Sequence, residues 1–192
     1  MPDPRDLAPA VSVVVPVYNS EQTLDELVTR LTAAVGPVSR VFEILLVNDG
    51  SRDRSWDAVQ RLALAHPDVR GISLVRNHGQ HNALLCGIRE ARGDVIVTID
   101  DDLQNRPEDV PALIARLREG CDVVYGVPRH QHWGFMRGIA SRVTKIVLQS
   151  AMGAKTASMV SGFRAIRADV REAFADYSSI FANLDVLLTW GA

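Results

Sequence analysis

Three consecutive aspartates, Asp100 to Asp102, are the side chains of this sequence that are best suited to bind a metal ion. They end an apolar, β-branched run, Val95–Ile99, which is typical of a buried strand. Pro107 follows a few residues later and suits the first turn of a helix. We therefore expect the carboxylates at the carboxyl end of a strand, where open α/β sheets bind their ligands.

Adjacent carboxylates repel one another unless a positive group neutralises them. A hard divalent cation, Mg²⁺ or Mn²⁺, is the natural partner, and Gln104 could add another oxygen ligand. The alternative is an acidic loop without a ligand, and this segment alone leaves that alternative open.

Polar side chains also follow the three preceding strands that the sequence predicts. Tyr18 follows the first and could stack on a flat heterocycle. Asp49 follows the second and could accept a hydrogen bond from a base N–H, although this turn could also cap a helix through Ser51 or Asp53. Arg76 follows the third and adds a cation. Since these strand ends share one edge of a parallel sheet, they describe a nucleotide-diphosphate pocket, in which a metal would stabilise the leaving diphosphate.

Strands and helices alternate along the segment that must position these residues. The expected strands are Val11–Val15, Phe42–Val47, Val69–Val75, Asp94–Ile99 and Val123–Gly126. The expected helices between them are Glu21–Ala34, Arg54–Ala65, Gln80–Ala91 and Pro107–Glu119. This alternation predicts an α/β fold with a mostly parallel sheet flanked by helices on both faces. The later pattern predicts helices over Phe135–Met152, Asp169–Phe174 and Ile180–Trp190.

Length and composition fit one globular domain, because the chain has 192 residues, 47% of them hydrophobic, and a net charge of −2. The charge gives no reason to expect nucleic acid. Cys86 and Cys121 form no CxxC pair and are expected to be buried free thiols, as in a reducing cytosol. Residues 1–10 lack the apolar core of a signal peptide and are predicted to be a tail before a domain at 11–192. No apolar run approaches the ~18 residues of a membrane-spanning helix, so any membrane contact is expected to be peripheral.

The stretch from Val123 to Ala168 contains no acidic residue. Its basic residues are Arg129, Arg137, Arg142, Lys145, Lys155, Arg164 and Arg167. This asymmetry indicates an anionic partner, although an ordinary solvated helix face would look the same. Arg137, Ser141 and Lys145 recur at a spacing of four and would share one helix face.

Four segments together resemble the family 2 glycosyltransferases: Pro16–Asn19, Asn48–Ser51, Arg76–His81 and Asp100–Asn105. The last of these, with Ser161–Arg164, is similar to the branch that transfers sugars to polyprenyl phosphates. The resemblance covers about Val11 to Arg171. It implies a glycosyltransferase A-type fold and an inverting, metal-dependent enzyme that moves a sugar from a nucleotide-diphosphate donor to a polyprenyl phosphate.

The resemblance also implies roles for individual residues. Those that would line the donor site are Pro16, Tyr18, Asn19, Asp49, Arg76, Asp100 and Asp101. Those that would surround the metal are Asp100, Asp102 and Gln104. Those that would hold the acceptor phosphate are Arg129, Arg137 and Ser141, and the catalytic residues would be Asp102, Arg129 and Arg137.

The chain departs from the family pattern at several positions. Ser20 stands where Glu is frequent, Asp101 stands where Ala is frequent, and Asn48 replaces an acid. No Asp comes shortly before Ser161. The chain also stops at Ala192, whereas family members usually continue, which predicts a truncated catalytic domain.

The acceptor separates the possible functions. A phosphate monoester is mostly dianionic at neutral pH and needs cations but no general base, which fits the acid-free stretch. A sugar hydroxyl would need a base, for which Asp185 is the candidate. A nucleotide-sugar-binding module without turnover is a further alternative. A nucleotidyltransferase fits less well, because Ser20–Thr23 is not a glycine-rich basic loop. The expected partners are thus a nucleotide-diphosphate sugar and a lipid phosphate at the cytoplasmic face of a membrane; a homo-oligomer is left open.

Overall fold

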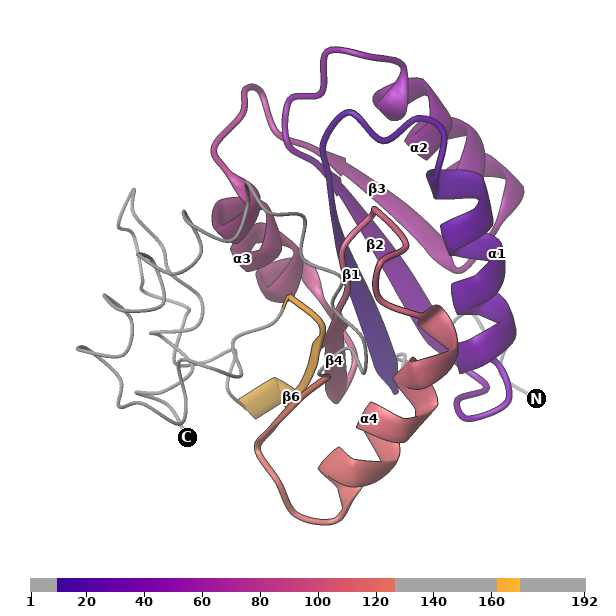
Figure 1. Cartoon of the computed structure of the whole chain (residues 1–192), viewed down its shortest axis with the longest axis vertical. Helices are drawn as coiled ribbons and strands as arrows, with labels where there is room; N and C mark the ends of the chain where they lie inside the picture. Colours follow the sequence, from indigo (N-terminus) through magenta and orange to yellow (C-terminus); the bar gives the residue numbers. More distant parts are fainter. Residues whose placement is uncertain (1–9, 127–161, 170–192) are drawn as a thin grey trace, which may run out of the picture.

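The sheet forms around β1 (Val11–Val17), a wholly buried strand that pairs in parallel with β2 on one side and β4 on the other. The computed structural model describes residues 10–126 and 162–169 (Figure 1). The further strands are β2 (Phe42–Asn48), β3 (Val69–Ser73), β4 (Val95–Thr98), β5 (Val123–Tyr125) and β6 (Arg164–Arg167). Their order across the sheet is β3-β2-β1-β4-β6-β5. The first four strands are parallel, and β6 runs antiparallel to both β4 and β5.

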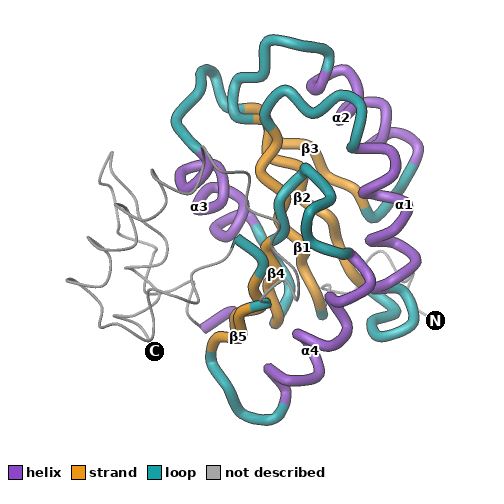
Figure 2. The backbone as a smooth tube through the Cα atoms, viewed as in Figure 1, coloured by secondary structure: helices purple, strands orange, loops and turns teal. Residues whose placement is uncertain are grey.

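Helices cover both faces of this sheet, as the alternation predicts (Figure 2). They are α1 (Leu24–Val35), α2 (Ser55–Ala65), α3 (Gln80–Glu90) and α4 (Val110–Arg118), the last preceded by the 3₁₀ turn η2 (Pro107–Asp109). The apolar sides of α1, α2 and α4 share one core with the sheet, and α3 forms a second core on the opposite face. The predicted α/β class and mostly parallel sheet are confirmed.

One strand of the sheet has no counterpart in the sequence prediction. β6 is four residues long and has an arginine at each end, so the sequence has no apolar run there that would predict a strand. It becomes a strand because it pairs with β4 and β5 at once, which buries Ala165 and Ile166 completely. The strand expected at Val123–Gly126 therefore lies beside β6 and not beside β4.

Two element boundaries differ from the prediction for local reasons. Helix α1 begins at Leu24 and not at Glu21, because residues 21–23 form a turn in which the backbone N–H of Thr23 donates to the carbonyl of Ser20 at 3.1 Å. Strand β3 ends at Ser73, and Val75 beyond it is fully exposed. The helices expected at Phe135–Met152 and Ile180–Trp190 lie outside the described residues, as does Asp169–Phe174 beyond its first residue.

The sheet has its topological switch point between β1 and β4. The chain moves from β1 to β2 and β3 on one side, and then returns to place β4 on the other. The pairing of β1 with β4 ends at Val14 and Thr98, so the last residues of β1 and the aspartates after β4 are free to separate. Ligands of open α/β sheets bind at such a point, outside the carboxyl ends of the strands.

Candidate active site

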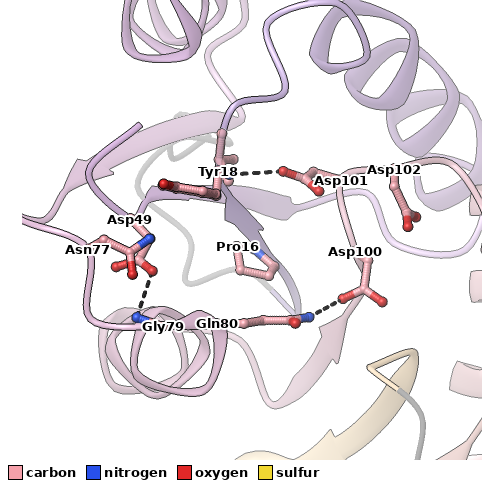
Figure 3. A pocket seen from close by; sticks show the side chains of 10 residues that line it. Pro16, Tyr18, Asp49, Asn77, Gly79, Gln80, Asp100, Asp101 and Asp102 are labelled. Carbon is pink, nitrogen blue, oxygen red and sulfur yellow. Dashed lines mark hydrogen bonds between the residues drawn. The ribbon is translucent and has the colours of Figure 1, made fainter. Parts of the chain in front are cut away.

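A pocket of about 290 Å³ lies at this switch point (Figure 3). Its walls come from the carboxyl end of β1, the start of α3 and the segments that follow β1, β2, β3 and β4. The lining residues are Pro16, Val17, Tyr18, Asp49, Asn77, Gly79, Gln80, Asp100, Asp101 and Asp102. The expectation that the polar strand ends converge on one edge of the sheet is thus met for Tyr18, Asp49 and the three aspartates.

Asp100 is half-buried between Gln80 of α3 and the segment that leads into β6. The side-chain amide of Gln80 donates to Asp100 Oδ1 at 2.6 Å (Figure 3). The backbone of Gly162 packs so closely that an added Cβ would lie 2.6 Å from Oδ1 and 2.7 Å from Oδ2. Burial raises the pKa of Asp100 to about 6, and repulsion from Asp102 and Asp101 acts in the same direction. Arg164 and the Gln80 hydrogen bond partly offset this rise by favouring the carboxylate.

Asp101 turns toward the loop after β1 instead (Figure 3). Its Oδ2 accepts hydrogen bonds from the backbone N–H of Tyr18 at 3.0 Å and from the hydroxyl of Ser20. Burial raises the pKa of Asp101, and these two hydrogen bonds counteract the rise.

Asp102 is exposed, and its Oδ1 accepts a hydrogen bond from the backbone N–H of Gln104 at 3.0 Å. The side chain of Gln104 is exposed and does not line the pocket. Gln80, which sequence reasoning did not single out, contributes the amide that faces the aspartates.

Asp49 is 3% exposed and binds the loop that leads into α3. Its Oδ1 accepts from the backbone N–H of His78 at 2.7 Å, and its Oδ2 accepts from that of Gly79 at 2.8 Å. The following residue, Gly50, has a φ of +64°, and a Cβ there would lie 2.6 Å from the Asn77 nitrogen. Asp49 and Gly50 therefore hold the loop after β2 against the loop before α3. Neither the base-binding nor the capping interpretation predicted this contact.

Tyr18 is 43% exposed, and its ring extends over the pocket (Figure 3). The next residue, Asn19, points its side chain elsewhere, because its Oδ1 accepts from the backbone N–H of Arg52 at 2.8 Å. Asn19 adopts a φ of +55° there and does not line the pocket. Arg76 is exposed and is also absent from the lining. Arg129, Arg137 and Ser141 lie outside the described residues.

Arg164 is a buried cation behind the aspartates. It is 1% exposed, its Nε donates to Thr98 Oγ1 at 3.3 Å, and its guanidinium lies 5.9 Å from the centroid of the Tyr125 ring. Thr98 Oγ1 in turn donates to the carbonyl of Gly162 at 2.6 Å. Gly162 and Arg164 thus lie behind Asp100, the first by close packing and the second by its charge. The small and basic residues of the Ser-Gly-Phe-Arg segment were the only signal in the sequence. Thr98, the partner of Arg164, lies more than sixty residues earlier in the chain.

A model of the family described as glycosyl transferase family 2 matches residues 12–174. The chain belongs to this family. Similar curated proteins are the undecaprenyl-phosphate 4-deoxy-4-formamido-L-arabinose transferases of Shewanella sediminis, 40% identical over 168 residues, and Pseudomonas paraeruginosa, 42% identical over 175 residues. The alignments cover 86% and 90% of this chain but 50% of each relative. The chain therefore spans about half the length of these relatives, and their names confirm the resemblance to the polyprenyl-phosphate branch.

Solved structures place the fold in the glycosyltransferase A-type class, as expected. The mannosyltransferase PcManGT from Pyrobaculum calidifontis, in complex with GDP-Man and Mn2+, aligns with a TM-score of 0.67 and 23% identity, over 98% of this chain and 52% of that one. Glucosyl-3-phosphoglycerate synthase from Mycobacterium tuberculosis, in complex with Mn2+, UDP and glucosyl-3-phosphoglycerate, aligns with a TM-score of 0.63 and 22% identity, over 84% of this chain and 58% of that one. At 22–23% identity, these alignments show a shared fold and nothing finer.

The carboxylates of this family 2 chain can contribute to a metal site only together with other ligands. Within residues 10–126 and 162–169, no three His, Cys, Asp or Glu side chains are gathered closely enough to hold an ion by themselves. Mg²⁺ is usually bound by one or two carboxylates, waters and substrate phosphates, and not by an all-protein cage. Asp100 and Asp102 line one pocket and offer hard oxygen donors, so they fit such a shared site.

We expect Asp49→Ala to weaken the binding of a free nucleoside diphosphate about tenfold or more. The substitution removes a buried carboxylate that lines the pocket and leaves the N–H groups of His78 and Gly79 without their acceptor, and a hydrogen bond of this charged kind is worth roughly 1.5–3 kcal/mol. Calorimetric titration would measure the change. Unchanged affinity in a protein that still folds would show that Asp49 serves only to join the two loops.

Proposed function

We propose that the chain is the donor-binding and catalytic part of an inverting, metal-dependent glycosyltransferase that transfers a sugar from a nucleotide-diphosphate donor to a polyprenyl phosphate. The observation that carries the proposal is one pocket at the switch point of the sheet, lined by an aromatic ring, a buried carboxylate and three aspartates. Membership of family 2 supports the reaction class. The names of the relatives support the class of acceptor.

The two sides of the pocket suit the two parts of a nucleotide sugar. Tyr18 and Asp49 would hold the base, by stacking and by a hydrogen bond to a base N–H. Asp100 and Asp102 would hold Mg²⁺ or Mn²⁺ against the diphosphate. The bound ion would supply Lewis-acid stabilisation of the leaving diphosphate. The two solved structures that share the fold and were determined with Mn2+ and a nucleotide or nucleotide sugar are consistent with this division.

The acid-free segment from Val123 to Ala168 would bind the acceptor. A phosphate monoester is held by cations and attacks without a general base, so this segment suits it better than a hydroxyl acceptor. A lipid phosphate also implies work at a membrane surface. In the part of the chain that the structure describes, no helix is both long and apolar enough to cross a bilayer.

The direct test is donor turnover by the purified chain. We would incubate it with a panel of nucleotide sugars and a short-chain polyprenyl phosphate, with and without Mn²⁺. Metal-dependent release of a nucleoside diphosphate, matched by a glycosylated lipid, is the expected result. Tight nucleotide binding without turnover would favour a nucleotide-sugar-binding module, which is the alternative left open by a chain that spans half of its relatives.

A pair of variants separates the two acceptor classes. Arg137→Ala should raise the KM for polyprenyl phosphate or lower the transfer rate about tenfold, because it removes a charge-assisted phosphate contact. Asp185→Asn should change transfer less than twofold, since a dianionic phosphate needs no deprotonation. Donor affinity should be preserved in both variants. The opposite ranking, with Asp185→Asn inactive and Arg137→Ala mild, would indicate a hydroxyl acceptor.

A further inference from the structure

Asp101 stands between the two metal-site candidates but makes contacts of a different kind. Its Oδ2 accepts from the backbone N–H of Tyr18 at 3.0 Å and from the hydroxyl of Ser20, and its own carbonyl accepts from Thr23 Oγ1 at 2.7 Å. All three partners belong to the segment between β1 and α1. Asp101, which follows β4, therefore holds the segment between β1 and α1 from the opposite side of the switch point.

The contact with Tyr18 matters because it is made to the backbone of the residue whose ring covers the pocket. Tyr18 is 43% exposed, so its ring is open to a ligand on the pocket side (Figure 3). The Ser20 hydroxyl also contacts the Tyr18 carbonyl at 3.1 Å, so the Asp101 carboxylate and Ser20 together hold the backbone N–H and C=O groups of Tyr18. That backbone in turn restricts the rotamers that the Tyr18 side chain can adopt.

The same contacts draw the carboxylate away from a metal. Oδ2 already accepts two hydrogen bonds, and Figure 3 shows the group turned toward Tyr18 and not toward Asp100. A carboxylate held in this way orients a loop and leaves the ion to its neighbours.

We propose that Asp101 is a positioning residue for the nucleobase: together with Ser20 it sets the backbone of Tyr18, so that the ring is in place to stack on the base of the donor. The inference rests on the proposed function, since it assumes that a nucleotide occupies this pocket. It assigns to Asp101 a role that acts through Tyr18, and it separates Asp101 from the ligand role of Asp100 and Asp102.

The test compares a probe that has a base with one that has none. We would titrate UDP, GDP, CDP and ADP, and separately pyrophosphate, into the protein with Mn²⁺ present. For the nucleoside diphosphate that binds most tightly, Asp101→Ala should lower the affinity about tenfold, because an exposed ring loses its fixed orientation. Pyrophosphate affinity should stay within twofold. Asp101→Asn should restore nucleotide affinity to within threefold of the wild type, since its amide oxygen can accept the same hydrogen bonds.

Further variants keep the result interpretable. Ser20→Ala should weaken nucleotide binding about threefold, and adding it to Asp101→Ala should cause little extra loss, because both side chains act on the backbone of Tyr18. Asp25→Ala is the matched control, since its carboxylate binds Arg61 at the surface of α1, and it should bind both probes like the wild type. If Asp101→Ala does not fold, Asp101→Asn and Ser20→Ala carry the test.

The outcomes that overturn the inference are distinct from the one that overturns the function. Equal losses for nucleotide and pyrophosphate would place Asp101 at the metal and phosphates. So would an Asp101→Asn variant as weak as Asp101→Ala. A wild-type protein that binds none of the four nucleotides would instead overturn the proposed function, and the inference with it.

Discussion

Asp102→Ala is expected to lower sugar transfer by about a thousandfold or more, to the background of the assay. Asp102 lines the pocket with its carboxylate exposed and uses one oxygen on the backbone of Gln104, so the other remains available for an ion that a donor brings. Removing it takes away half of the protein's proposed carboxylate ligands. Lewis-acid stabilisation of a leaving group is worth several kcal/mol, and each 1.4 kcal/mol is a factor of ten in rate.

The measurement is the initial rate of product formation at saturating donor and Mn²⁺. Circular dichroism and thermal unfolding serve as the folding control, since an exposed side chain contributes little to stability. Titration with Mn²⁺ in the presence of a nucleoside diphosphate should show a weakened ion site. Full wild-type activity in excess EDTA would remove the metal from the proposal. Losses as total for Asp101→Ala as for Asp102→Ala would contradict the separation of their roles.

Gly162→Ala should lower kcat/KM about a hundredfold, although the residue bears no functional group. Its backbone lies against Asp100 so closely that a methyl group would be 2.6 Å from one carboxylate oxygen and 2.7 Å from the other. The Gly162 carbonyl is held by Thr98 Oγ1 at 2.6 Å, so the backbone cannot easily withdraw. Asp100 must therefore turn and lose its hydrogen bond from Gln80. A displacement of about 1 Å at a catalytic group can cost about a hundredfold in rate.

Gly120→Ala is the matched control for this experiment. Gly120 has a φ of +106° and open space where a Cβ would go, at the end of α4 and away from the pocket. It should lose about 1 kcal/mol of stability, because L residues rarely adopt that conformation, and keep its kcat/KM. A Gly162→Ala variant with wild-type kcat/KM would show that the position of Asp100 does not depend on the backbone that leads into β6.

Much of the site could be predicted because it depends on local patterns. The apolar runs that became β1, β2 and β4 are visible in the sequence, and right-handed crossovers bring their carboxyl ends to one edge. That was enough to place Tyr18, Asp49 and the aspartates in one pocket. The family motif added the expectation of a nucleotide sugar, and the family match confirms the class.

By itself, then, the sequence determined the four parallel strands of the sheet, the edge that carries the pocket and the residue types that reach it. Only the tertiary structure decided which amide faces Asp100, where Asp101 points, and that β6 runs between β4 and β5 with Arg164 buried behind the site. The physical reason is the range of the interactions. Strand and helix periodicity reports burial over a few neighbouring residues, whereas these contacts join residues that are from 20 to 83 positions apart, and no local pattern encodes them.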